Sequence, residues 1–177
     1  MNMNANMNLS EPAPRWVFER RERVRFGHCD PAGIVFYPRY FEMLNALIED
    51  WVSEGLGVDF SQLLGPRRVG LPTVHLETDF RRISRMGDTL IQRIAITRLG
   101  RSSLGLTVHF EGEGDDEGRA APESSEPHPG PRVVFQQVLV CTSLDSHRPQ
   151  AFPDDLRAAL TLALTLRAPG PQDGPKE

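Results

Sequence analysis

Residues 38–54 constrain the fold most strongly, because they are typical of a helix that is apolar almost all the way round. One stripe at helical spacing consists of Tyr40, Leu44, Leu47, Ile48 and Trp51, and the other apolar positions are Phe41, Met43, Ala46 and Val52. Pro38 suits the first helical turn, and Gly55 and Gly57 end the helix. A helix of this kind is buried inside a larger structure, and a sheet of half-buried strands would cover it.

Five other segments alternate apolar and polar residues with the period of two that is typical of half-buried strands. Their alternating positions are Trp16, Phe18, Val24 and Phe26; Val74, Leu76, Thr78 and Phe80; Leu90, Ile94 and Ile96; Leu104, Leu106, Val108 and Phe110; and Val133, Phe135, Leu139 and Cys141. Short joints at residues 86–88 and 99–102 predict sequential hairpins, and therefore a meander. With a short helix expected near residues 153–166, the predicted fold class is α+β, one long helix wrapped by an antiparallel sheet.

All of these elements fit one domain, residues 15–166, in a chain of 177 residues. Residues 1–14 are polar and rich in Asn, and residues 167–177 are rich in Pro and Gly, so both are predicted to be disordered tails. Residues 112–131 are rich in Gly, Pro, Ser and acidic side chains, and are predicted to form a flexible insertion.

The composition excludes several classes of partner. A net charge of -4 gives no electrostatic basis for binding nucleic acid. No run approaches the roughly 20 apolar residues that cross a bilayer, and no signal peptide opens the chain. The two cysteines, Cys29 and Cys141, lie far apart and lack zinc-site spacing, so we expect free thiols, no metal and a cytoplasmic location.

The segment FGHCDPAGIVFYP, residues 26–38, closely resembles the 4-hydroxybenzoyl-CoA thioesterase family, in which a loop aspartate precedes the central helix. Three weaker matches follow in the family's order: GLPTV at 70–74, Gly-Asp at 87–88 and GRSS at 100–103. The resemblance covers residues 15–111 and, more loosely, 132–165. It implies the hotdog fold, in which a curled antiparallel sheet encloses a long helix.

The resemblance implies hydrolysis of an acyl-CoA to the free acid and CoA, with no cofactor beyond the CoA of the substrate. Asp30 would attack the thioester carbonyl or activate water. The backbone N–H groups near Phe36 and Tyr37 would stabilise the oxyanion, and Gly33 would leave room for close approach. The alternative for Asp30 is an Asx turn or a helix N-cap, which Asp-Pro commonly forms.

For the rest of the substrate, the resemblance and the need to bind phosphates point to Arg101, Ser102 and Ser103 at the CoA end. Phe36, Pro38, Thr73 and Trp51 are candidates to contact the acyl group, with Trp51 otherwise a core residue. Pro38 favours an aromatic acyl group such as a benzoyl type, because the short-chain branch commonly has His there. Arg81, Arg82, Arg85 and Arg98 are more typical of a solvated charged edge, which is also the alternative for Arg101. His28 and Cys29 are weaker catalytic candidates. His75 and His109 are expected at a surface or interface, with a place in the pocket wall as the alternative for His75.

The resemblance also implies a homodimer or homotetramer with each site at the subunit interface. One alternative function is a hotdog hydratase or dehydratase, which usually pairs a His with an acidic residue; no His lies in residues 38–54. The other is a non-catalytic module that binds acyl-CoA, because a fold does not fix a function.

Overall fold

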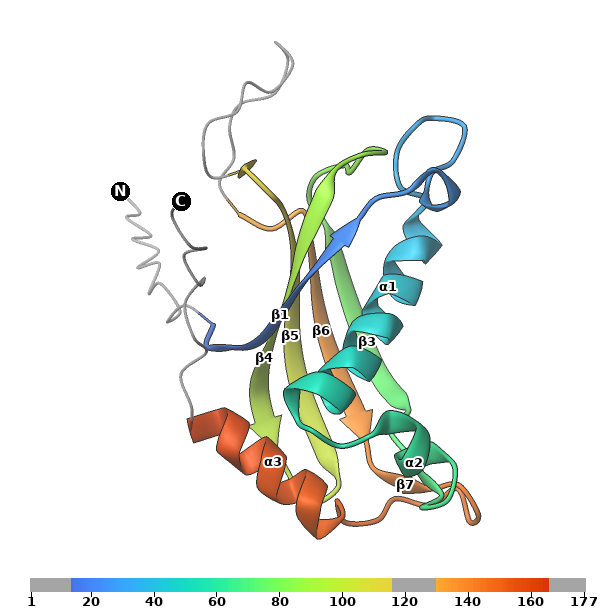
Figure 1. The fold of residues 1–177 in the computed structure, drawn as a ribbon, viewed down its shortest axis with the longest axis vertical. Coiled ribbons are helices and arrows are strands. Elements are labelled where there is room, and N and C mark those ends of the chain that lie inside the picture. The colour runs from blue at the N-terminus through green and yellow to red at the C-terminus, as the bar shows by residue number, and fades with distance from the viewer. Residues whose placement is uncertain (1–13, 116–129, 166–177) are drawn as a thin grey trace, which may run out of the picture.

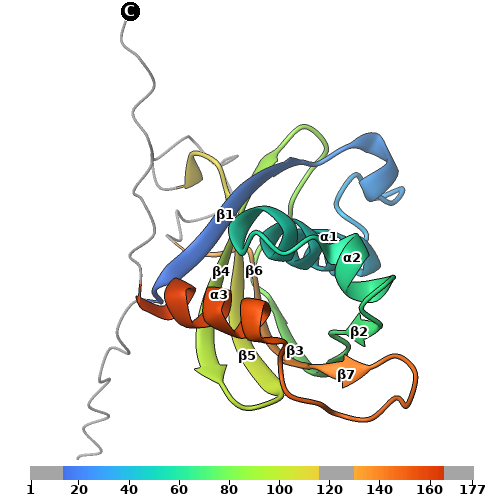
Figure 2. The same ribbon diagram turned by 60° about the horizontal axis from the view of Figure 1, so that its bottom comes forward.

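A computed structural model describes residues 14–115 and 130–165 of the chain. Its main elements are a five-stranded antiparallel sheet and the helix α1 (Tyr37–Asp50). The strands are β1 (Trp16–Arg23), β3 (Thr73–Phe80), β4 (Thr89–Leu99), β5 (Ser103–Gly112) and β6 (Val133–Val140). The sheet curves along one side of α1 (Figures 1 and 2), which confirms the predicted α+β arrangement of a long helix against a curved antiparallel sheet.

The strand order is β1-β4-β5-β6-β3, so only β4, β5 and β6 form a meander. The predicted hairpin at residues 86–88 is wrong, because β3 pairs with β6 while β4 pairs with β1. Residues 81–88 therefore cross one end of the sheet, and we call them the crossover segment. Alternation reports which side of a strand is buried but not which strand lies next to it, so the sequence pattern missed this pairing.

Helix α1 buries the predicted stripe against the sheet. Its buried residues are Tyr40, Met43, Leu44, Leu47 and Ile48, while the polar strip of Glu42, Asn45 and Glu49 is exposed. The chain continues as a π-helical turn, Trp51–Gly55. A Cβ on Gly55 would lie 2.6 Å from Trp51 and 2.8 Å from Phe18, so glycine lets the helix end close to β1.

The core lies between α1 and the face of the sheet that meets it. The fully buried side chains include Leu44, Leu47, Trp51, Leu90, Ile94, Leu104, Leu106, Phe110, Phe135 and Leu139. Each such burial stabilises the fold by roughly 1.5–3 kcal/mol relative to an exposed side chain. This packing fixes α1 on the sheet, and with it the loop that leads into the helix.

The structure differs from the predicted first strand at two aromatic residues, Trp16 and Phe26. A register shift between Trp16 and Phe18 places these two side chains on opposite faces, since they pair with the adjacent residues Ala95 and Ile94. Trp16 instead packs edge-to-face against His109, with ring centroids 4.7 Å apart. β1 ends before Phe26, which is 83% exposed in a turn of 3-10 helix.

The remaining elements flank this core. The short helix α3 (Asp154–Thr165) is confirmed, whereas α2 (Phe60–Leu64) and the two-stranded sheet of β2 (Val69–Gly70) and β7 (Thr142–Ser143) were not predicted. The predicted tails and most of the predicted insertion lie outside the described residues. No helix in the described part of the chain combines the length and apolarity needed to cross a bilayer.

Candidate functional site

Asp30 lies in a small hairpin, residues 28–36, that we call the Asp30 hairpin. The backbone N–H of Gly33 donates to the carbonyl of Asp30 over 2.9 Å and closes the turn. The N–H of Phe36 donates to the carbonyl of His28 over 2.9 Å and closes the base. Because α1 begins at the next residue, the hairpin is held at the start of the buried helix.

Gly33 has a φ of +75°, a conformation that side chains other than glycine rarely adopt. A Cβ at Gly33 would meet no protein atom within 4 Å. Within this chain, glycine is therefore required by the backbone conformation of the turn and not by close packing of protein atoms.

The carboxylate of Asp30 forms an Asx turn. Its Oδ1 accepts a hydrogen bond from the backbone N–H of Ala32 over 2.8 Å, so the structural role weighed in the sequence analysis is present. The side chain is half-buried, and its Oδ2 has no hydrogen-bond partner among the described residues. One oxygen thus holds the turn, while the other is available to a ligand.

The first turn of α1 has one free backbone donor. No side chain caps the helix, whose N-cap is Phe36, and the Phe36 N–H is bonded to His28. Pro38 has no N–H, and the N–H of Arg39 donates to the Phe36 carbonyl over 2.8 Å. Among the first three helical positions, only the Tyr37 N–H lacks an acceptor in the described residues, and it lies at the positive end of the helix dipole.

The crossover segment supports the returning arm of the Asp30 hairpin. The N–H of Val35 donates to the carbonyl of Ser84 over 2.9 Å, and Ile34 forms an antiparallel bridge with Arg85. The returning arm therefore lies between the outgoing arm and the crossover segment, and this fixes the orientation of the hairpin relative to the sheet.

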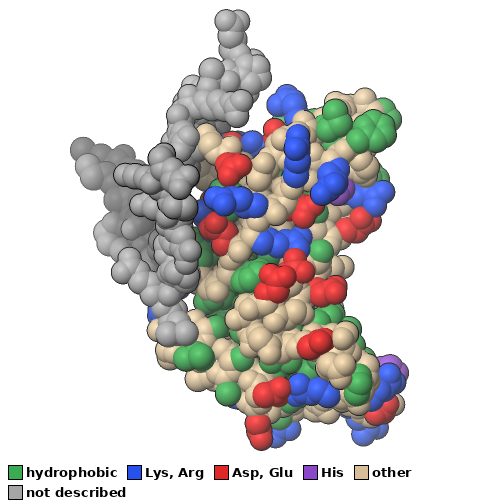
Figure 3. Space-filling view, in the orientation of Figure 1, with side chains coloured by type: hydrophobic (Ala, Val, Ile, Leu, Met, Phe, Trp, Pro, Cys, Tyr) green, Lys and Arg blue, Asp and Glu red, His purple; other side chains and the backbone are tan. Residues whose placement is uncertain are grey.

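Aromatic rings form a continuous path from this surface into the core. The Tyr37 ring lies 5.4 Å from Phe36 and 6.4 Å from Phe80, and the Phe41 ring lies 6.3 Å from Phe80 and 6.0 Å from the buried Phe135. Phe36 and Tyr37 are 45% and 59% exposed. Hydrophobic side chains gather at the tip of the molecule where the Asp30 hairpin lies (Figure 3).

The residues predicted to bind CoA lie at the other end of the sheet, together with Thr73, which was predicted to contact the acyl group (Figure 1). Thr73 and Ser103 pair with the neighbouring residues Leu139 and Val140, whereas Phe80 pairs with Val133. An eight-residue strand spans about 25 Å. Within this chain, the structure therefore brings together Asp30, Gly33, Phe36, Tyr37 and Pro38, but not Thr73, Arg101, Ser102 and Ser103.

The other arginines considered for CoA have partners within the protein or lie at a solvated edge. Arg82 forms an ion pair with Asp115 at 3.0 Å, and Arg81 approaches Asp79 at 3.4 Å. Arg98 donates to the Ser103 hydroxyl over 3.4 Å. The exposed side chain of Arg101 has no such partner among the described residues.

The weaker catalytic candidates have structural contacts. The Nδ1 of His28 accepts a hydrogen bond from the N–H of Arg25 over 3.1 Å, and the Sγ of Cys29 lies 3.7 Å from the Arg25 carbonyl. Trp51 is 1% exposed and belongs to the core. His75 is exposed beside Glu77, at 3.2 Å, as expected for a surface residue.

Gln137 is a polar core residue that the sequence analysis missed. It is 2% exposed, its Nε2 donates to the Thr73 hydroxyl over 2.8 Å, and its Oε1 has no partner among the described residues. Its signal in the sequence is a glutamine on the buried face between Phe135 and Leu139. Thr73 therefore has a polar partner that orients its hydroxyl.

The buried polar groups near the helix start include Tyr40, which is 4% exposed. Burial raises the pKa of its phenol, so the hydroxyl remains protonated at neutral pH. In the described residues, no three His, Cys, Asp or Glu side chains form a group that could hold a metal ion. The described residues of the site provide a carboxylate beside a helix N-terminus.

Comparisons with known proteins agree with this geometry. The Thioesterase-like superfamily profile matches residues 24–160. A 1,4-dihydroxy-2-naphthoyl-CoA hydrolase from Prochlorococcus marinus is 33% identical over 103 residues, 54% of this chain; the match spans 66% of that relative, just under two thirds of its length.

Solved structures show the same fold. A thioesterase-superfamily structure from a Jannaschia species matches with a TM-score of 0.69 and 28% identity, covering 87% of this chain and 97% of that one. A gentisyl-coenzyme A thioesterase matches with a TM-score of 0.65 and 24% identity, covering 79% and 99%. The hotdog fold implied by residues 26–38 is thereby confirmed. With a family match over residues 24–160, which include the Asp30 hairpin, the helix α1 and all strands of the sheet except β1, the chain belongs to the Thioesterase-like superfamily.

Proposed function

We propose that this protein is an acyl-CoA thioesterase that hydrolyses an aromatic acyl-CoA to the free acid and CoA. The observation that carries the proposal is the position of Asp30, whose half-buried carboxylate lies in a hairpin that leads straight into the first turn of α1. The named relatives act on 1,4-dihydroxy-2-naphthoyl-CoA and gentisyl-CoA, which are both aromatic thioesters.

In one proposed route, Asp30 attacks the thioester carbonyl, the C–S bond breaks to release the CoA thiolate, and water hydrolyses the resulting acyl-Asp30 anhydride. In the other, Asp30 removes a proton from water as the water attacks, the C–S bond breaks, and the proton passes to the departing CoA thiolate. The free N–H of Tyr37 donates to the developing oxyanion, assisted by the helix dipole. Gly33 maintains the left-handed turn that holds the carboxylate there. No cofactor is needed, because CoA enters as part of the substrate.

The acyl group is proposed to lie against Phe36, Tyr37 and Pro38. The exposed rings of Phe36 and Tyr37 offer a planar acyl group both apolar area and edge-to-face contact. Pro38 has no backbone N–H to donate at the helix start, so the hydrogen bond to the substrate is assigned to the Tyr37 N–H.

The CoA end is proposed to be bound by Arg101, Ser102 and Ser103, with Thr73 nearby on the substrate path. These residues lie at the far end of β3 from Asp30 in the same protomer. If two copies pair through β3 about a two-fold axis, the strands are antiparallel, and the Thr73 end of one copy lies beside the Phe80 end of the other.

A homodimer that pairs through β3, or a tetramer of two such dimers, would therefore complete each site at the interface. β3 is an edge strand, and its Val74 and Phe80 side chains are 59% and 49% exposed. We also assign the protein to the cytoplasm, a reducing compartment in keeping with its two free cysteines.

A hotdog hydratase or dehydratase is less well supported, because Tyr37–Asp50 contains no histidine to pair with an acid. A non-catalytic acyl-CoA-binding module would not require a carboxylate beside the start of a helix with one oxygen that lacks a partner among the described residues.

The test is release of CoA thiol from aromatic, short, medium and long acyl-CoAs by the full-length protein and by Asp30→Asn. We expect turnover to be highest with aromatic substrates and to fall on the order of 100- to 10,000-fold in the variant. Acyl-CoA binding without thiol release from any substrate would instead support the binding module, and hydration of an enoyl-CoA without thiol release would support the hydratase.

A further inference from the structure

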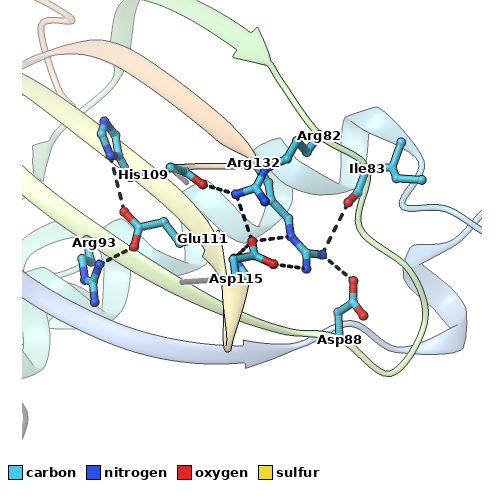
Figure 4. Close-up of polar contacts among 10 residues, drawn as sticks. Arg82, Ile83, Asp88, Arg93, His109, Glu111, Asp115 and Arg132 are labelled. Carbon is cyan, nitrogen blue, oxygen red and sulfur yellow. Dashed lines mark hydrogen bonds and ion pairs between the residues drawn. The ribbon is translucent and has the colours of Figure 1, made fainter. Parts of the chain in front are cut away.

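Arg132, just before β6, connects the crossover segment to Asp115, which follows β5, at the end of the sheet that carries the Asp30 hairpin (Figure 4). Its guanidinium makes two hydrogen bonds to Asp115, at 2.9 and 3.0 Å, and also binds Asp88. Its side chain is 13% exposed, so these contacts are shielded from water. Arg132 was not among the candidate residues predicted from the sequence.

We propose that Arg132 is a positioning residue for Asp30 that acts through the crossover segment. The proposal rests on the function proposed above, because Asp30 has chemistry to position only if it acts on the substrate. Arg132 itself is not expected to touch the reacting atoms.

Arg132 contacts the crossover segment through both its backbone and its side chain. Its backbone carbonyl accepts hydrogen bonds from the N–H groups of Arg81 and Arg82, over 2.8 and 3.1 Å. Its Nη1 donates to the carbonyl of Ile83 over 3.4 Å and binds Asp88 near the other end of the segment. One residue therefore contacts both ends of the segment.

The crossover segment in turn contacts the Asp30 hairpin. The Oδ2 of Asp88 accepts the N–H of Arg85 over 2.9 Å, which shapes the turn before β4. Arg85 and Ser84 in turn form the bridge to Ile34 and the 2.9 Å hydrogen bond from Val35. A shift of this segment is thus transmitted directly to the arm that follows Asp30 in the chain.

The contacts of Arg132 depend on the shape of its guanidinium group. Only the planar guanidinium fork can engage the Asp115 carboxylate in two hydrogen bonds while donating to Asp88 and a carbonyl; lysine offers a single ammonium. Burial opposes the charge of Arg132, but Asp115 and Asp88 raise its pKa, so it stays charged across the working pH range. A substitution by lysine keeps the charge and loses this geometry.

The test compares Arg132→Lys with Arg93→Lys in the full-length protein. Arg93 is a matched control on β4, because it is 25% exposed and binds two carboxylates, Glu19 and Glu111. Within the described residues, neither carboxylate forms a hydrogen bond or ion pair with the Asp30 hairpin. Both changes remove a guanidinium from a partly buried ion-pair network, so they should cost similar stability.

We expect Arg132→Lys to lower kcat on the order of 10- to 100-fold, since small displacements of a reacting group are costly, with KM within about threefold of wild type. Hydrogen exchange of the Val35 and Phe36 amides should accelerate while the native oligomer persists. Arg93→Lys should change neither kcat nor this exchange. Equal losses of kcat in both variants, or unchanged exchange in Arg132→Lys, would overturn the proposal.

Two provisions keep the result decisive. If Arg132→Lys does not fold, Asp88→Asn, which keeps an acceptor for the Arg85 N–H but weakens the bond to Arg132, is judged by the same readouts. If the wild-type protein releases thiol from no acyl-CoA, the proposed function fails, and the exchange data alone decide the coupling: faster exchange supports it and unchanged exchange overturns it.

Discussion

The backbone N–H of Phe36 donates to the carbonyl of His28 over 2.9 Å, and this bond closes the hairpin that carries Asp30. The backbone N–H groups of Phe36 and Tyr37 were both predicted to stabilise the oxyanion. Because the Phe36 N–H is used in this bond, the Tyr37 N–H is the one of the two that has no acceptor among the described residues. The catalytic proposal is therefore specific about both groups: one oxygen of Asp30 and one amide of Tyr37.

Asp30→Asn separates the chemical role of Asp30 from its Asx turn. The amide oxygen of asparagine still accepts the Ala32 N–H, so we expect the free energy of unfolding to change by less than about 0.5 kcal/mol. Turnover should still fall 100-fold or more, on the order expected for loss of a base or nucleophile. Urea unfolding and thiol release measure the two effects.

Asp59→Asn is the matched control for that substitution. Asp59 also accepts backbone N–H groups, from Ser61 and Gln62, but caps α2 away from the Asp30 hairpin. We expect full turnover from it. If Asp30→Asn retained wild-type turnover as Asp59→Asn does, the Asx turn would be the whole role of Asp30.

Gly33→Ala should destabilise the protein by about 1–2 kcal/mol, because alanine at a φ of +75° is strained although space is available. Gly27→Ala is the control, since a Cβ there also meets open space and the backbone is not left-handed. Thermal unfolding compares the two. Equal melting temperatures for both variants would contradict a conformational role for Gly33.

Val74→Lys should break up the proposed assembly. The side chain is 59% exposed on the edge strand β3, and a paired strand would bury the new charge. Light scattering should show a smaller species, with reduced thiol release if the site spans two copies. Leu162→Lys, at a 55% exposed position on α3, is expected to leave the assembly intact; dissociation by both variants would argue against pairing through β3.

Asp115 should make stability sensitive to acid. Burial opposes its ionisation, but hydrogen bonds and charge from Arg132, with the charge of Arg82, lower its pKa below the usual value. Its contribution is therefore present above the unfolded-state pKa, about 3.9, and is lost as the pH falls through the lower folded-state pKa. Urea unfolding over this range should show a flatter pH dependence for Asp115→Asn; an unchanged slope would show that other groups dominate.

The two thiols should differ in reactivity. Cys141 is fully buried, and burial raises its pKa, whereas Cys29 is only half-buried. We expect iodoacetamide to modify one thiol of the native protein rapidly and the second only after unfolding. The rapid phase should disappear in Cys29→Ser, and its persistence there would assign it to Cys141.

The sequence predicted those elements whose signal is local. The stripe from Tyr40 to Trp51 repeats every three or four residues, so both the helix and its buried face were predicted. The alternation from Leu104 to Phe110 predicted β5 in the same way. The sequence also predicted which residues meet at the start of α1, because these residues are neighbours in the chain: Asp30, Gly33, Phe36, Tyr37 and Pro38.

The remainder depends on contacts between distant residues. Nothing near Phe80 indicates that its strand pairs with residues 133–140 and not with the next strand along. The bulge that turns Trp16 to the opposite face adds one residue to the pairing without a Gly or Pro to mark it. Arg132 was missed because its partners, Asp88 and Asp115, come from other turns.

The strand order has a consequence for synthesis on the ribosome. β1 and β3 occupy the two edges of the sheet, and their partners, β4 and β6, come later in the chain. The nascent chain therefore emerges with a strongly apolar helix and two unpartnered strands, and the sheet is completed only after residue 140 has left the exit tunnel. We expect the unfinished chain to depend on chaperones that bind apolar segments. The hairpins of β4, β5 and β6 should form first, and the edge strands β1 and β3 should then pair with them.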